Sequence, residues 1–187
     1  MYKLYKIIKL FLFVVAGILT IVFAHDFIAN NGENINLFVG IVIAFFGLEF
    51  AILMLLKHEV KKEPIKFLNA LINILLAVIM IFLIEGNGWE VRIACTIWCI
   101  WSIMREGEEI FEKVLEGIKK HPITSAINFA ESVVVIIFSI GLLTVEPHEL
   151  VEHTLKHVYL LGVELILEVV WPYLAYLEEK LFCKKTK

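Results

Sequence analysis

Six ionisable side chains lie within or at the ends of strongly apolar segments of this 187-residue chain. They are five glutamates and one arginine, namely Glu49, Arg105, Glu109, Glu131, Glu164 and Glu168. A charge at the centre of a bilayer costs about 3 kcal/mol or more, so such groups face a protein interior or water. Carboxylates gathered in a low dielectric cannot all ionise, and at least one is expected to keep its proton. These residues predict either a site for protons or cations, or buried hydrogen bonds that only hold helices together.

Three of the glutamates recur at nearly constant spacing. Glu49, Glu109 and Glu168 lie in the stretches FFGLEFAI, REGEEIFE and ELILEVVW, 60 and 59 residues apart. Gly47 and Gly107 precede the first two glutamates by two residues. Membrane proteins are often built from internal repeats, so this spacing predicts three carboxyl groups at comparable depth.

Arg105 is the counter-charge expected for these carboxylates. It lies four residues, about one helical turn, before Glu109, and this spacing allows an ion pair along one helix. Glu106 and Glu108 fall where the apolar segment ends, and they are expected to be solvated.

A polar row with helical spacing is expected in the last apolar segment. It comprises Glu149, His153, His157, Leu161, Glu164 and Glu168. Leu161 interrupts it, so a continuous proton path would need water or another helix. Histidines change charge between pH 5 and 8, which suits a sensor of external acid. The histidines assigned to the outer face are His25, His148, His153 and His157.

Glu149, His153 and His157 follow one another at four-residue spacing, and such a row can bind a divalent metal. The row lacks the HExxH pattern, and a solvated, titrating surface is the favoured interpretation. The three cysteines form no CxxC motif, and no phosphate-binding glycine loop or GxSxG motif is present. The sequence therefore predicts no cofactor and no enzyme activity.

The elements that must position these groups are membrane helices. Hydrophobic residues make up 60% of the chain, the mean hydropathy is +0.84, and the net charge of −3 does not suggest a nucleic-acid partner. Segments of about 20 apolar residues are expected to cross a bilayer as helices. Six such segments are found, at 7–24, 36–56, 66–84, 89–107, 123–144 and 155–177.

Basic residues give the expected orientation. Fourteen of the 17 Lys and Arg residues lie at the N-terminus, the C-terminus or the loops after the second and fourth segments. The positive-inside rule therefore predicts cytoplasmic termini and a single domain of three helical hairpins, at about 1–60, 61–118 and 119–187. The near-identical sequences KKEPI (61–65) and KKHPI (119–123) would be the cytoplasmic turns between hairpins, with proline in the first helical turn.

The second and sixth segments, FVGIVIAFFGLEFAI and LLGVELILEVVW, resemble the HdeD-like family of acid-resistance membrane proteins. The six-segment layout is similar too. The resemblance implies an all-α, integral inner-membrane bundle that acts in acid or envelope stress. Its partners would be the lipid bilayer and either a second copy or another membrane protein. A small cation or metal transporter, and a scaffold whose polar groups only hold the fold, remain as alternatives.

Overall fold

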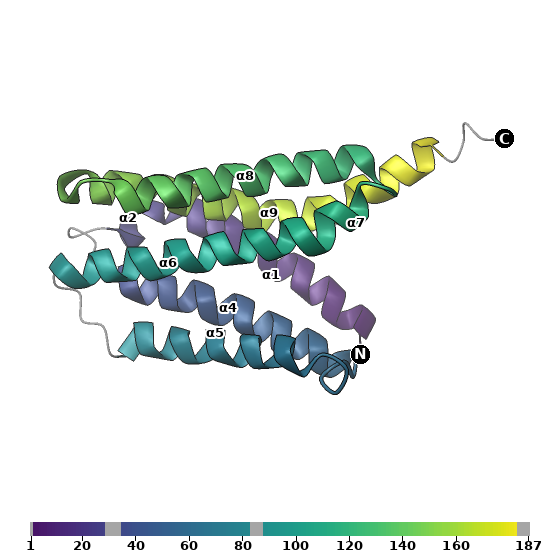
Figure 1. Cartoon of the computed structure of the whole chain (residues 1–187), viewed down its shortest axis with the longest axis horizontal. Helices are drawn as coiled ribbons and strands as arrows, with labels where there is room; N and C mark the ends of the chain where they lie inside the picture. The colour runs from purple at the N-terminus through teal and green to yellow at the C-terminus, as the bar shows by residue number, and fades with distance from the viewer. Residues whose placement is uncertain (1, 29–34, 83–87, 183–187) are drawn as a thin grey trace. The chain divides into compact units, whose positions relative to one another are not determined.

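The computed structural model describes residues 2–28, 35–82 and 88–182, and these residues form helices and short turns with no strand. The all-α class predicted from the sequence is confirmed. The long helices are α1 (Tyr2–Val22), α4 (Ile35–Leu56), α5 (Pro64–Phe82), α6 (Gly88–Glu109), α8 (Pro122–Thr144) and α9 (Leu150–Phe182) (Figure 1). The short elements are α2 (Ala24–Phe27), the π-helix η1 (Ile110–Val114), α7 (Leu115–Gly117) and the 3₁₀ helix η2 (Pro147–Glu149).

Four helices among the described residues are long and apolar enough to cross a membrane. Their spanning portions are Ile35–Leu56, Pro64–Phe82, Pro122–Thr144 and Leu150–Leu181. The two other expected segments are helical as well, as α1 and α6, and the apolar part of α1 is the shorter stretch Ile7–Val22. Four helices of this kind indicate a membrane protein.

Helix α8 has its polar side chains inside and its apolar side chains outside. Ser125, Ser132 and Ser139 are buried, whereas Ile137 and Phe138 are 59% and 42% exposed. In water this arrangement would be unfavourable, because large exposed apolar surfaces are normally covered. In lipid the apolar face needs no cover, and small residues are typical of helix contacts.

The described helices fall into two compact units. The first comprises Met1–Ile8 and His25–Thr96, and the second comprises Lys9–Ala24 and Ile97–Lys187. In the first unit, α4 and α5 pack along each other (Figure 1). Two glycines permit this contact: a Cβ atom at Gly40 would lie 3.1 Å from the carbonyl oxygen of Ala77, and one at Gly47 would lie 3.2 Å from that of Ala70.

A left-handed residue ends α4 and starts the turn toward α5. His58 has a φ of 56°. Its N–H donates to the carbonyl of Leu55 at 3.1 Å, and the N–H of Glu59 donates to that of Met54 at 3.0 Å. These two bonds define a Schellman motif, which satisfies carbonyls that the end of a helix leaves without donors. Histidine is among the few non-glycine residues enriched in this conformation.

The KKEPI and KKHPI turns have the same backbone structure. In the first, the N–H groups of Lys62 and Glu63 donate to the carbonyl of Glu59 at 2.8 and 2.9 Å. In the second, those of Lys120 and His121 donate to the carbonyl of Gly117 at 2.9 and 2.7 Å. All the equivalent positions are 58 residues apart, and proline opens the following helix in both cases. The repeated residues therefore make one repeated turn.

In the second unit, α1 and α9 cross at two glycines. A Cβ atom at Gly17 would lie 2.7 Å from the carbonyl oxygen of Gly162, and one at Gly162 would lie 3.0 Å from that of Gly17. The two backbones are therefore in direct contact, which larger residues at these positions would prevent. Helix α9 also packs along α8 (Figure 1).

The N-terminus of α8 is capped from a distant part of the chain. Glu178, near the end of α9, accepts hydrogen bonds from the backbone N–H groups of Ile123 and Thr124 at 2.9 and 3.0 Å and from the Thr124 hydroxyl at 2.7 Å. The N-cap residue, His121, makes no side-chain cap itself. A carboxylate is favourable here because the first N–H groups of a helix have no helical partners and carry partial positive charge.

We expect Glu178→Gln to destabilise the protein by about 1 kcal/mol, because the amide keeps one acceptor and loses the charge that favours this helix terminus. Glu178→Ala should cost about 2 kcal/mol, since it also leaves the N–H groups without an acceptor. Thermal unfolding in a lipid nanodisc measures both. Glu108→Gln is the matched control because Glu108 is exposed, and equal unfolding temperatures for all three variants would contradict the capping role.

Candidate functional site: a polar seam in the second unit

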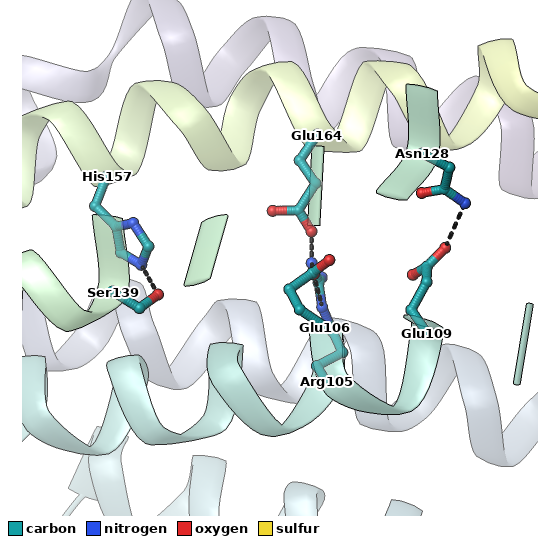
Figure 2. Close-up of polar contacts among 7 residues, drawn as sticks. All are labelled: Arg105, Glu106, Glu109, Asn128, Ser139, His157 and Glu164. Atoms are coloured by element: carbon teal, nitrogen blue, oxygen red, sulfur yellow. Dashed lines mark hydrogen bonds and ion pairs between the residues drawn. The ribbon is translucent and has the colours of Figure 1, made fainter. Parts of the chain in front are cut away.

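Polar side chains of α6, α8 and α9 meet along one line in the second unit, which we call the polar seam. Figure 2 shows three sets of contacts that follow one another along the helices. They are His157 with Ser139, Arg105 with Glu106 and Glu164, and Glu109 with Asn128. The seam thus joins candidate residues from three helices that are far apart in the sequence.

Arg105 lies at the middle of the seam between two carboxylates. Its guanidinium forms ion pairs with Glu106 on the same helix and with Glu164 of α9. The side chains of Glu106 and Glu164 are only 3% and 8% exposed, and that of Arg105 is 18% exposed. The ring of Trp101 lies 5.3 Å from the guanidinium carbon and adds a cation–π contact. Arg105 therefore holds α6 against α9 through buried charges.

Further carboxylates lie beside this pair. Glu109 accepts a hydrogen bond from the side-chain amide of Asn128 at 3.2 Å. Glu131 accepts one from the indole N–H of Trp171, and it interacts electrostatically with Glu106, Glu109 and Glu168. We call the connected set the carboxylate cluster, and its members are Arg105, Glu106, Glu109, Glu131, Glu164 and Glu168.

A buried histidine forms another level of the seam. His157 is 3% exposed, and its Nε2 atom lies 3.4 Å from the hydroxyl oxygen of Ser139. Its ring centroid lies 4.6 Å from that of Trp98. Imidazole between a hydroxyl and an indole is held in one orientation, with both ring nitrogens inside the protein.

The contacts give α6 and α9 a constant register. Trp98 meets His157, and Arg105 meets Glu164, so both pairs are offset by 59 residues. Two helical segments that keep one offset over two turns run parallel and nearly level. Glu109 and Glu168 are also 59 residues apart, so the register places these two carboxyl groups at the same level of the seam.

Two backbone irregularities lie at that level. The π-helix η1 begins directly after Glu109, and the N–H of Leu115 donates to the carbonyl of Ile110. Segments of π-helix are often found at functional sites, where they shift the direction of the side chains that follow. Pro172 lies inside α9 and has no N–H to donate to the carbonyl of Glu168. Near the cluster, the backbone after α6 therefore forms a π-helical turn, and α9 lacks one backbone hydrogen bond.

Glu49 belongs to the first unit and has its own contact there. The hydroxyl of Tyr5 donates to its carboxylate at 2.8 Å. This bond links α1 to α4 within that unit. The expectation that Glu49 shares a depth with Glu109 and Glu168 stays a prediction.

The histidines expected on the outer face differ in their surroundings. His25 and His148 are exposed, and His153 is half-buried. His148 lies 3.4 Å from Glu146 and 3.8 Å from Glu149. The expectation of a solvated surface is wrong for His157, because the packing of α9 against α8 and Trp98 encloses it. No three His, Cys, Asp or Glu side chains among the described residues are arranged to hold a metal ion, so Glu149, His153 and His157 do not form such a group there.

Two features of the seam were missed from the sequence. Glu106 was expected to be solvated, but it is 2% exposed because its side of α6 faces α9. The polar face of α8 had a detectable signal: Ser125, Ser132 and Ser139 are spaced by seven residues, which is two helical turns. Asn128 lies on the same side, between the first two serines.

Comparison with known proteins provides no relative from which a role could be transferred. The chain matches no protein-family model, no curated protein and no solved structure.

Proposed function

We propose that this protein is a six-span, multi-pass protein of the cell inner membrane with both termini in the cytoplasm. The four long apolar helices support membrane insertion, and α1 and α6 would provide the remaining spans. The lysines of the KKEPI and KKHPI turns support a cytoplasmic position for those turns. The polar inner face of α8 and its apolar outer face support contact with lipid.

Within this framework, the protein is a non-enzymatic, proton-responsive membrane protein of the HdeD-like kind that acts in acid stress. One observation carries the proposal: Arg105 forms ion pairs with Glu106 and Glu164, and Glu131 beside them is repelled by the charges of Glu106, Glu109 and Glu168. Arg105 can neutralise only part of their charge, and the low dielectric disfavours the remainder. We infer that the cluster holds at least one proton, which belongs to the cluster as a whole and not to one residue.

Acidification adds protons to this cluster and removes repulsion between α6, α8 and α9. The seam then becomes more tightly packed, which would alter how the helices meet lipid or another protein. A small cation could replace the protons in the same cluster, because carboxylates are its preferred ligands. Transport of a cation is therefore the second candidate function, and it is favoured by the excess of carboxylates over arginine.

Infrared spectroscopy of the protein in lipid nanodiscs tests the proposal. We expect a carbonyl band of protonated carboxylic acid that persists at neutral pH and grows as the pH falls further. Glu131→Gln should remove part of this band, because it replaces a titrating group by an amide of the same size. Glu179→Gln, at an exposed carboxylate outside the cluster, should leave the neutral-pH band unchanged.

A neutral-pH spectrum without protonated carboxyl groups would contradict the proton-responsive function. Proteoliposomes then separate the two candidates. A pH gradient that the wild-type protein maintains as well as empty liposomes supports a responsive protein without transport. A sodium or potassium flux that is lost in Glu131→Gln would favour the transporter.

A further inference from the structure

Two polar atoms on uncharged side chains of the seam have no hydrogen-bond partner among the described residues. They are Nδ1 of His157 and the hydroxyl oxygen of Ser132, and these side chains are 3% and 0% exposed. A buried polar atom without a partner costs about 1–3 kcal/mol. Proteins commonly satisfy such atoms with ordered water, which needs several polar partners around it. Two of these atoms in one seam point to a bound polar ligand.

The register places Ser132 level with the carboxylate cluster and His157 at a separate level of the seam. Helices α8 and α9 run in opposite directions, and Ser139 meets His157. Seven residues further along α9 and seven residues back along α8 lead to Glu164 and Ser132, which are therefore level with each other. The imidazole lies two helical turns from them, or about 10 Å.

Helix α6 provides a polar group for the interval between these levels. On α9 the interval contains Leu161, which interrupts the polar row. The offset of 59 residues between α6 and α9 makes Ser102 level with Leu161, and Ser102 is 4% exposed. Hydroxyl or imidazole groups are thus available at each level from His157 to Glu164.

We propose that the seam holds a short chain of ordered water between His157 and Glu164, with Ser102 and Ser132 as its hydrogen-bond partners, and that His157 passes protons through it to the carboxylate cluster. This proposal rests on the proton-responsive function proposed above. It gives protons a route to the carboxylate cluster, and the ligand that it assigns to the seam is water.

The chemistry requires only exchange of protons. His157 accepts a proton on one ring nitrogen and gives one up from the other, so the ring ends with its original charge. The hydroxyl of Ser139 can both donate and accept, and a return exchange through it restores the first tautomer. The groups that face the ring are Ser139 from α8, Trp98 from α6 and the charge of Arg105 from α6. On α9 itself, His153 and Glu164 are the neighbouring titratable groups at one and two turns.

Deuterium exchange at the protonated carboxyl groups tests the route. The wild-type protein in nanodiscs is mixed with D₂O buffer at neutral pH, and the shift of the carboxylic carbonyl band is followed over time. We expect exchange on the order of 100-fold slower in His157→Gln, because a positioned proton carrier typically contributes at least that factor. Ser102→Ala should also slow exchange, and it provides a second variant if His157→Gln does not fold.

His58→Asn is the matched control, since it removes an exposed histidine from a turn of the first unit and keeps a residue that tolerates its positive φ. It should exchange at the wild-type rate. The carbonyl band itself must remain in all variants, because the carboxylates are unchanged. If the band remains and both His157→Gln and Ser102→Ala exchange at the wild-type rate, the relay is refuted while the proton-responsive function stands. If the wild-type band is absent, the function fails and the relay fails with it.

Discussion

Arg105→Met should lower the free energy of unfolding by about 3–5 kcal/mol at neutral pH, which is the usual cost of removing one partner from a buried charged pair. Methionine keeps much of the apolar length of the arginine side chain. The loss therefore arises from Glu106 and Glu164, whose side chains are 3% and 8% exposed and would keep their positions without a counter-charge. Reversible unfolding in mixed detergent micelles provides the measurement.

The pH dependence of this loss identifies its cause. In Arg105→Met, the two carboxyl groups can relieve the burial of charge only by binding protons. Protons are more available at low pH, so the difference from wild type should shrink as the pH falls from about 7 to 5. A loss that comes from packing alone would not change with pH, because methionine does not titrate.

Two further variants complete the test. Glu106→Gln combined with Glu164→Gln in the Arg105→Met background should recover much of the lost stability, since no buried charge then remains in the pair. Lys61→Met is the control, because Lys61 is exposed in the KKEPI turn of the first unit, and such surface changes usually stay within about 0.5 kcal/mol. An Arg105→Met variant as stable as wild type at neutral pH would refute the ion-pair role.

The parts of the fold that were predicted from the sequence depend on local chemistry. Apolar runs such as 36–56 and 123–144 became α4 and α8 because a segment without water must satisfy its backbone groups internally. The KKEPI and KKHPI turns are structurally equivalent because residues close together in the sequence form the same two backbone hydrogen bonds in each. The spacing of 59 residues between Glu109 and Glu168 also agrees with the register of α6 and α9, which the contacts of Trp98 and Arg105 define.

The features that were missed depend on contacts between distant residues. Glu178 caps α8 although 54 residues separate it from Thr124, and no capping motif precedes the helix. The burial of Glu106 and His157 is likewise decided by which side of α6 and α9 faces the seam. Apolar residues occur on both the lipid-facing and the protein-facing sides of α6 and α9, because lipid and the protein interior are equally apolar. Hydrophobic periodicity therefore distinguishes the two sides poorly in a membrane helix.

Gly17→Ala should destabilise the second unit by about 1–3 kcal/mol, the range typical of overpacking a close contact. The added Cβ atom would lie 2.7 Å from both the carbonyl oxygen of Gly162 and Cγ1 of Ile166. The isoleucine side chain can move, but the carbonyl oxygen belongs to the backbone of α9. The two helices must therefore separate at this crossing.

Gly162→Ala adds a Cβ atom to the same crossing from the α9 side. Its Cβ atom would lie 2.6 Å from Cγ1 of Ile21 and 3.0 Å from the carbonyl oxygen of Gly17. Once one alanine has separated the helices, the second has less contact to disturb, so the double variant should lose less than the sum of the single variants. That non-additivity distinguishes a shared crossing from two independent defects.

Gly141→Ala is the matched control for this crossing. It also lies within a helix of the second unit, α8, and a Cβ atom there would meet nothing within 4 Å. Alanine favours helix over glycine by about 1 kcal/mol in water, so this variant should be at least as stable as wild type. Thermal unfolding in nanodiscs should therefore place Gly17→Ala and Gly162→Ala below wild type and Gly141→Ala at or above it. If all three alanines shifted the unfolding temperature alike, the effect would come from helix propensity, and direct contact between the backbones of α1 and α9 would be ruled out.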